Sequence, residues 1–192
     1  VNIGSVQNTG WELSYTQRVL DRKEIAIDYT VTGSTNKNKM LKLGDGISPI
    51  ASGNRNTQRN LPGYPLYGLW DKTITYNDAN ADHIIVLGEM TFSDTAVYQG
   101  TTFPTREVAF TPAVELLNHK LRISSQFDSK WGFKKFNNTL RHQCMNGVSC
   151  RGRYDASASL QQQAYALATS QSVFTGMFED GAFTRWREAS VS

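Results

Sequence analysis

The chain has 192 residues and a formal charge of +3, with 39% hydrophobic, 11% aromatic and 19% charged residues, which suits a folded domain and excludes a disordered chain. Its Lys and Arg residues are scattered without a dense basic block, so nucleic-acid binding is not expected. No apolar run approaches the roughly 20 residues of a membrane-spanning helix. The sequence opens at Val1 without an initiator Met, and we therefore expect a processed polypeptide or part of a longer one.

Residues 10–43 are predicted to form a hairpin. Apolar and polar residues alternate along two runs, and a polar turn at residues 21–23 separates the runs. A period of two indicates strands with one apolar and one polar face. The apolar positions are Trp11, Leu13, Tyr15, Ile25, Ile27, Tyr29 and Val31.

Residues 44–104 are predicted to form a long loop that begins with an aromatic turn. The turn contains Tyr64, Tyr67 and Trp70 and is stiffened by Pro62 and Pro65. Exposed aromatic rings at such a place could stack on a sugar ligand or contact a partner protein. Alternatively, the rings form the small core that holds a long loop together, and we favour this interpretation.

An acidic run follows, with the spacing of the calcium-binding loop D-x-[DN]-x-[DN]-G-x5-E. On this template the ligands are Asp78, Asn80, Asp82, the backbone carbonyl of Ile84, and Glu89. The sixth position needs a sharp turn at positive φ, and His83 replaces the usual glycine there, so the sequence indicates a weakened calcium site. The alternative, which we favour, is a hairpin of Asx-turns in which the acidic and amide side chains bond their own backbone. In either case a strand is expected over residues 84–87, because the run is rich in β-branched residues.

Residues 105–133 are predicted to form a second hairpin, with its turn at Asn118 and His119. A second long loop over residues 134–182 contains one predicted helix, which starts at Asp155 or Ser157. Its apolar face consists of Leu160, Ala164, Leu167 and Ala168. Residues 183–192 are predicted to begin a further strand.

Cys144 and Cys150 lie close together in a segment rich in Gly, Asn and Ser. A close pair of cysteines in a turn-rich loop favours a disulfide over a metal site. A metal site would normally need four ligands, and only His142 lies near the two cysteines. A disulfide in turn indicates an extracytoplasmic location.

The predicted elements define an all-β fold class, mainly antiparallel hairpins with long loops and one short helix. Short turns that alternate with long loops are typical of an outer-membrane β-barrel, whose strands turn apolar residues to lipid and polar residues to the lumen. A soluble antiparallel sandwich shows the same alternation with the apolar face inward. The alternating runs approach the 9–11 residues of a tilted membrane strand, which favours the barrel.

Catalysis is not expected. His83, His119 and His142 lie in loops and turns outside any nucleophile or metalloprotease motif, and no G-x-S-x-G turn occurs. Glu179 and Asp180 are adjacent carboxylates, but neighbouring strand residues point to opposite faces, so they do not indicate a glycosidase pair.

The opening NIGSVQNTGWELS resembles a strand of the SusC/RagA-type TonB-linked outer-membrane transporters. Five further segments resemble later barrel strands and extracellular loops of that family, in the same order: PGYPLYGLW, TYNDANADHIIVLGE, YQGTTFPTREVAFTP, FDSKWGFKKFNNT and FEDGAFTRWREASVS. The family's acidic loop usually reads D-x-N-G-D-G, whereas Ala81 and His83 replace both glycines here. Nothing in the chain resembles the family's plug domain, its TonB-contacting segment or its closing strands.

The resemblance implies a segment of an outer-membrane transporter that imports oligosaccharides or peptides, with a SusD-like lipoprotein and TonB as partners. The alternative is a non-catalytic architectural or accessory subunit derived from such a protein. It would pack on the periplasmic side of a large membrane complex, such as a respiratory or photosynthetic assembly. Both hypotheses place the chain outside the cytoplasm and in contact with other protein chains. Calcium is the one cofactor that the sequence suggests.

Overall fold

The computed structural model describes residues 4–147 and 149–192. Contacts divide the chain into two compact units. The strand unit comprises residues 6–39, 103–133 and 181–192. The loop unit comprises residues 40–102 and 134–180 together with the start of the chain. The two segments predicted as long loops therefore supply nearly all of a folded unit of their own.

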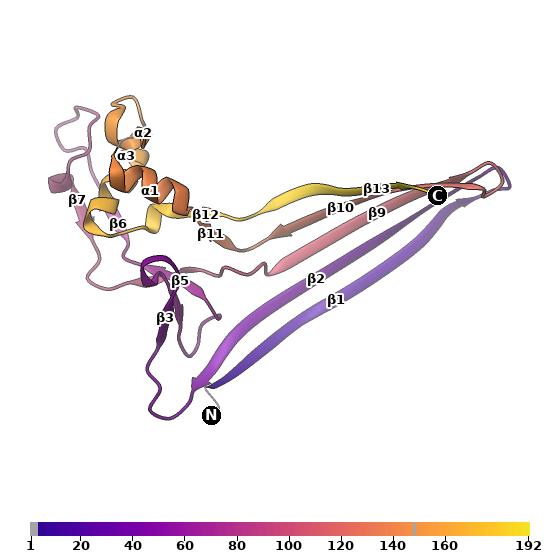
Figure 1. The fold of residues 1–192 in the computed structure, drawn as a ribbon, viewed down its shortest axis with the longest axis horizontal. Coiled ribbons are helices and arrows are strands. Elements are labelled where there is room, and N and C mark those ends of the chain that lie inside the picture. Colours follow the sequence, from indigo (N-terminus) through magenta and orange to yellow (C-terminus); the bar gives the residue numbers. More distant parts are fainter. Residues whose placement is uncertain (1–3, 148) are drawn as a thin grey trace. The chain divides into compact units, whose positions relative to one another are not determined.

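The strand unit is a five-stranded sheet of long strands (Figure 1). In spatial order the strands are β1 (Gly4–Asp21), β2 (Ile25–Leu43), β9 (Arg106–Leu116), β10 (Leu121–Trp131) and β13 (Phe183–Val191). The pairs β2–β9, β9–β10 and β10–β13 are antiparallel. The turn from β9 to β10 runs through Leu117, Asn118 and His119, all at positive φ. The all-β fold class is confirmed.

Cross-strand pairing sorts the alternating residues of the strand unit onto two faces. Val31 of β2 lies opposite Phe110 of β9, and Phe110 lies opposite Phe127 of β10. Phe127 in turn lies opposite Trp186 of β13. Because directly opposed residues share a face of the sheet, these four side chains form an apolar row across four strands.

The loop unit contains three small sheets. Its four-stranded sheet has the order β3 (Ile50–Ser52), β4 (Gln58–Asn60), β5 (Gly68–Asp71) and β8 (Val97–Gly100). The two-stranded sheets pair β6 (Ile74–Tyr76) with β7 (Met90–Phe92), and β11 (Lys134–Phe136) with β12 (Phe178–Asp180). These strands are only three or four residues long, which is too short to show a period of two in the sequence.

Helices α1 (Asn138–Asn146), α2 (Arg151–Tyr154) and α3 (Leu160–Ala168) belong to the loop unit, as do the 3-10 segments Asn54–Asn56, Leu87–Glu89, Thr169–Gln171 and Thr175–Met177. The predicted helix is α3. It begins after Ser159, which forms a capping box with Gln162, and so starts later than the expected Asp155 or Ser157. Helices α1 and α2 were not predicted, since α1 has a largely polar sequence whose start is marked only by Asn137. Among the described residues, no helix is long and apolar enough to cross a membrane.

Helix α3 lies at the centre of the loop unit, because it contributes to two buried clusters. One cluster consists of Ile85, Met90, Ala164, Ala168 and Val173. The other consists of Cys144, Cys150, Ala166, Phe174 and Met177. The small alanine side chains allow neighbouring segments to approach the helix closely from both sides.

Candidate functional site

One face of the strand unit exposes large apolar side chains. Tyr15, Tyr29 and Phe110 form a ladder of tilted rings across β1, β2 and β9, with centroid separations of 6.3 and 6.0 Å. Trp11 lies four residues before Tyr15 on β1 and is 82% exposed. Trp186 on β13 is 66% exposed. In a protein surrounded by water, the apolar face of a sheet is normally buried against other parts of the protein. This exposed face is therefore suited to contact lipid or another chain.

The opposite face of the same sheet is held together by ion pairs. Asp128 on β10 accepts hydrogen bonds from Arg185 (2.9 Å) and Arg187 (3.0 Å) on β13. A bulge in the β10–β13 register leaves Arg187 without a directly opposed residue, so both guanidinium groups reach one carboxylate. Two cations share one anion here, which leaves guanidinium N–H groups available to other acceptors.

A second ion-pair network crosses four strands. Arg122 on β10 donates to both carboxylate oxygens of Asp28 on β2, each at 2.8 Å, and to Glu115 on β9 at 2.6 Å. Glu115 also contacts His119 at 2.7 Å and Arg18 at 3.5 Å. The bidentate contact between Arg122 and Asp28 fixes the register of the strands as well as neutralising the charge.

A groove of about 630 Å³ lies on this polar face. Charged groups of both signs line it, including Glu12, Glu107, Asp128, Lys130 and Arg187. Lys130 and Glu107 form an ion pair at 2.8 Å. Ser and Thr hydroxyl groups and Gln126 also line it, together with the apolar residues Leu13, Val108 and Ala109. The groove therefore offers many hydrogen bonds to a polar solute.

The acidic loop of the loop unit uses its side chains to hold its own backbone. Asp78 accepts hydrogen bonds from the backbone N–H groups of Asp82 (3.2 Å) and His83 (2.9 Å). Asn80 accepts one from Asp82, and Asp82 accepts one from Ile84 at 2.8 Å. These are the contacts that the Asx-turn alternative predicts.

Glu89 closes the same loop. Its two carboxylate oxygens accept hydrogen bonds from the backbone N–H groups of Ala79 (3.0 Å) and Val86 (3.2 Å). The side-chain oxygens of the calcium template are thus engaged with the loop backbone, although each oxygen keeps a further lone pair. No cluster of three or more His, Cys, Asp or Glu side chains suited to a metal ion occurs in the described part of the chain. Calcium binding at this loop stays a prediction.

The strand predicted over residues 84–87 is wrong. Residues 84–86 are irregular, and a 3-10 turn over Leu87–Glu89 precedes β7. The N–H groups that a neighbouring strand would have bound go to side chains instead, that of Ile85 to Gln163 and that of Val86 to Glu89. The β-branched composition was therefore overridden by these contacts.

Two rings of the aromatic turn form a small cluster with a third ring. Tyr64 and Trp70 meet edge to face with centroids 4.6 Å apart, and Tyr98 of β8 lies 5.3 Å from Tyr64 and 5.7 Å from Trp70. Burial raises the pKa of Tyr98. Tyr67, at positive φ, instead bonds through its backbone to Asn60 and Thr102. Tyr64 and Trp70 thus pack against other rings, while Tyr64 is 39% exposed. Contact of these rings with a ligand or partner stays a prediction.

A buried carboxylate joins β5 to the segment after α3. Asp71 accepts hydrogen bonds from the backbone N–H groups of Phe174 (2.6 Å) and Lys72 (2.7 Å). Burial raises the pKa of Asp71 above its ordinary value, while these two hydrogen bonds act in the opposite direction.

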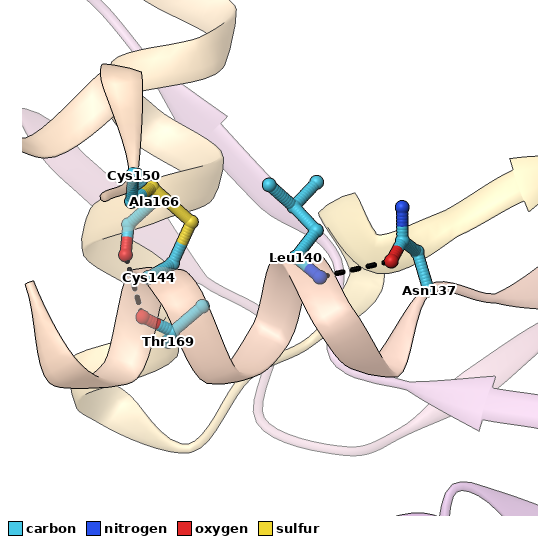
Figure 2. The surroundings of a disulfide bond; sticks show 6 residues. All are labelled: Asn137, Leu140, Cys144, Cys150, Ala166 and Thr169. Atoms are coloured by element: carbon cyan, nitrogen blue, oxygen red, sulfur yellow. Dashed lines mark hydrogen bonds between the residues drawn. A yellow bond between two sulfur atoms is a disulfide. The ribbon is translucent and has the colours of Figure 1, made fainter. Parts of the chain in front are cut away.

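The structure contains a disulfide between Cys144 and Cys150, as the sequence predicts. Both residues are buried, and the bond links the end of α1 to the start of α2 (Figure 2). The same view shows Asn137 capping α1 through the N–H of Leu140, and Thr169 donating to the carbonyl of Ala166.

Sequence reasoning did not identify Gln163, Asp71 or the ion-pair partners of the strand unit. Asp28 and Arg122 lie at polar positions of alternating runs, so the sequence assigns each to the polar face of its strand. Their ion pair, however, joins residues 94 positions apart. No local pattern reports such a contact.

These features define a β-rich chain whose long-stranded sheet has one apolar and one charged face. No protein-family model matches the chain, and no curated protein matches it. Its structure is similar to that of the RagAB peptide transporter, with 15% sequence identity and a TM-score of 0.67 over 99% of this chain and 23% of that chain. The RagAB peptide importer is similar in its closed-closed state (15% identity, TM-score 0.68, 99% and 23%) and in its open-open state (15%, 0.66, 98% and 22%).

The chain spans less than a quarter of the length of the matched chain in each of these structures. At this identity the similarity establishes the fold. The chain therefore has the fold of part of a RagAB chain.

Proposed function

We propose that this chain is a segment of a SusC-like, TonB-linked outer-membrane transporter that imports oligosaccharides or peptides. The observation that carries the proposal is the two-faced sheet of the strand unit. Exposed side chains such as Trp11, Phe110 and Trp186 suit a lipid-facing wall, and the ion pairs of Asp28 and Asp128 suit a polar lumen. The fold similarity to the RagAB structures supports the same assignment.

In this proposal the strands of the strand unit cross the outer membrane, and the loop unit belongs to the extracellular loops. The polar groove of the strand unit faces the lumen, where its charged and hydroxyl groups contact hydrated solute. A SusD-like lipoprotein and TonB are the partner proteins. The chain itself performs no catalysis.

The test uses the four tryptophans of the chain in the native membrane protein. Variants that retain only one Trp are placed in vesicles whose lipids carry bromine on the acyl chains, which quench nearby indole fluorescence. We expect strong quenching for Trp186, which lies on the apolar face, and none for Trp70, which packs against Tyr64 in the loop unit. Equal quenching of the two would reject the assignment of the apolar face to lipid.

The mass of the native polypeptide, and the fraction in which it is found, distinguish this proposal from the subunit hypothesis. A mass several times 21.5 kDa in the outer-membrane fraction supports a transporter segment. A mass near 21.5 kDa that co-purifies with a larger membrane complex would instead support an architectural subunit.

A further inference from the structure

The acidic loop exposes an apolar surface that the loop unit does not cover. Ile84, Val86 and Leu87 are 45%, 52% and 43% exposed, whereas Ile85 between them is 3% exposed. We call the three exposed residues the apolar tip. Single exposed aliphatic residues are common on protein surfaces, but three within four positions form a local patch that favours a binding surface.

The backbone that carries the apolar tip is held in place. Ile85 packs in the buried cluster with Met90 and α3, and its N–H bonds to Gln163 at 2.9 Å. Val86 is fixed at both backbone groups, since its N–H donates to the Glu89 carboxylate and its carbonyl accepts from the Glu89 N–H at 3.0 Å. A surface that is already ordered loses little conformational entropy when a partner binds.

The charge around the apolar tip indicates the kind of partner. Residues 73–105 contain four carboxylates and no Lys or Arg, in a chain whose net charge is +3. The carboxylates belong to Asp78, Asp82, Glu89 and Asp94. The apolar tip therefore lies in the middle of an anionic segment.

This charge argues against two of the possible occupants. Anionic lipid headgroups would be repelled by the carboxylates, and a second copy of the loop would bring like charges together. A protein surface with cations around an apolar centre has the complementary pattern.

We propose that the apolar tip is a docking site for a partner protein that presents an apolar groove bordered by Lys and Arg. Ile84, Val86 and Leu87 fill the groove. The carboxylates of Asp78, Asp82 and Glu89 hold the loop backbone, and their negative charge attracts the basic border. The inference does not depend on transport, since it rests on the exposure, order and charge of this loop alone.

The test places a photo-crosslinking side chain at Leu87 in the full native protein in its own membrane. A matched control places the same side chain at Val97 on β8, which is also exposed and aliphatic. We expect crosslinks from position 87, and none from position 97, to one protein whose crosslinked peptide is apolar and flanked by Lys or Arg. The substitutions Val86→Ser and Leu87→Ser, tested by co-purification of that protein, should weaken its affinity about tenfold each.

Each other outcome overturns the proposal. Crosslinks to lipid, to a second copy, or to another segment of the same polypeptide would identify a different occupant of the apolar tip. Absence of crosslinks would show that no partner occupies it. An unchanged affinity in the Ser variants would show that the patch does not bind. If either of the other substitutions lowers the melting temperature, Ile84→Ser provides an independent variant. Full affinity of the Ile84→Ser variant for the partner would also refute the proposal.

Discussion

The side chain of Gln163 in α3 accepts a hydrogen bond from the backbone N–H of Ile85, at 2.9 Å and across 78 positions of sequence. Its amide nitrogen donates to the carbonyl oxygens of His83 (3.0 Å) and Ala158 (2.9 Å). Gln163 is 4% exposed, so these bonds are shielded from water. One buried side chain thus replaces the neighbouring strand that Ile85 lacks and ties the acidic loop to the helix at the centre of the loop unit.

The substitution Gln163→Leu should lower the free energy of unfolding of the loop unit by about 2–4 kcal/mol, because it leaves the buried N–H of Ile85 and the carbonyl of His83 without partners. Denaturant unfolding measures the loss, and hydrogen exchange at Ile85 should accelerate. Gln161→Leu on the exposed side of α3 is the matched control and should change stability little. Equal effects of the two substitutions would contradict the role of the buried amide.

The pH dependence of stability should report the burial of Asp71. Its folded-state pKa is raised, with burial as the largest cause, so the folded chain binds a proton more tightly than the unfolded chain. By linkage, this group makes folding more favourable as the pH falls through the folded-state pKa. In urea unfolding, the wild type should therefore gain stability relative to Asp71→Asn as the pH is lowered from neutrality toward the ordinary range of an aspartate. A relative loss over the same interval would mean that the N–H groups of Phe174 and Lys72 outweigh burial.

Loss of the disulfide should destabilise the loop unit by about 2–3 kcal/mol, since closing even a short loop restricts the unfolded chain. Comparison of the oxidised protein with the Cys144→Ala/Cys150→Ala variant by denaturant unfolding gives the value. Thiol titration of the native protein without reductant is the control. If both cysteines react, the disulfide is absent from the native protein.

The long strands were predictable because their signal is local. In β1 and β2, apolar residues such as Leu13 and Ile27 recur at every second position, and this pattern alone indicates which side chains share a face. The close pair Cys144 and Cys150 was predictable for the same reason, as was α3 from its apolar face. Each of these features is contained within a few neighbouring residues.

The remaining features depend on contacts between distant residues. The ion pairs of Arg122 with Asp28 and of Arg187 with Asp128 follow from strand register and from a bulge, which the sequence does not reveal. The predicted strand after the acidic loop failed because Gln163, far along the chain, binds its backbone. Local composition indicates what a segment prefers, and tertiary partners decide what it forms.

Two residues of the acidic loop adopt backbone angles that favour glycine. Ala81 and His83 have φ values of 58° and 61°, in the left-handed region that costs a residue with a Cβ roughly 1–2 kcal/mol. Glycine adopts these angles without that strain, and the calcium template requires it at the position of His83.

We therefore expect Ala81→Gly/His83→Gly to raise the melting temperature and to bind calcium more tightly than the wild type. The measurement is the melting temperature in millimolar calcium and in chelator. A larger calcium-dependent shift in the double variant, removed by Asp78→Asn, would establish the loop as a weakened metal site. If neither chain responds to calcium, the side chains of Asp78, Asn80 and Asp82 serve only to hold the loop backbone.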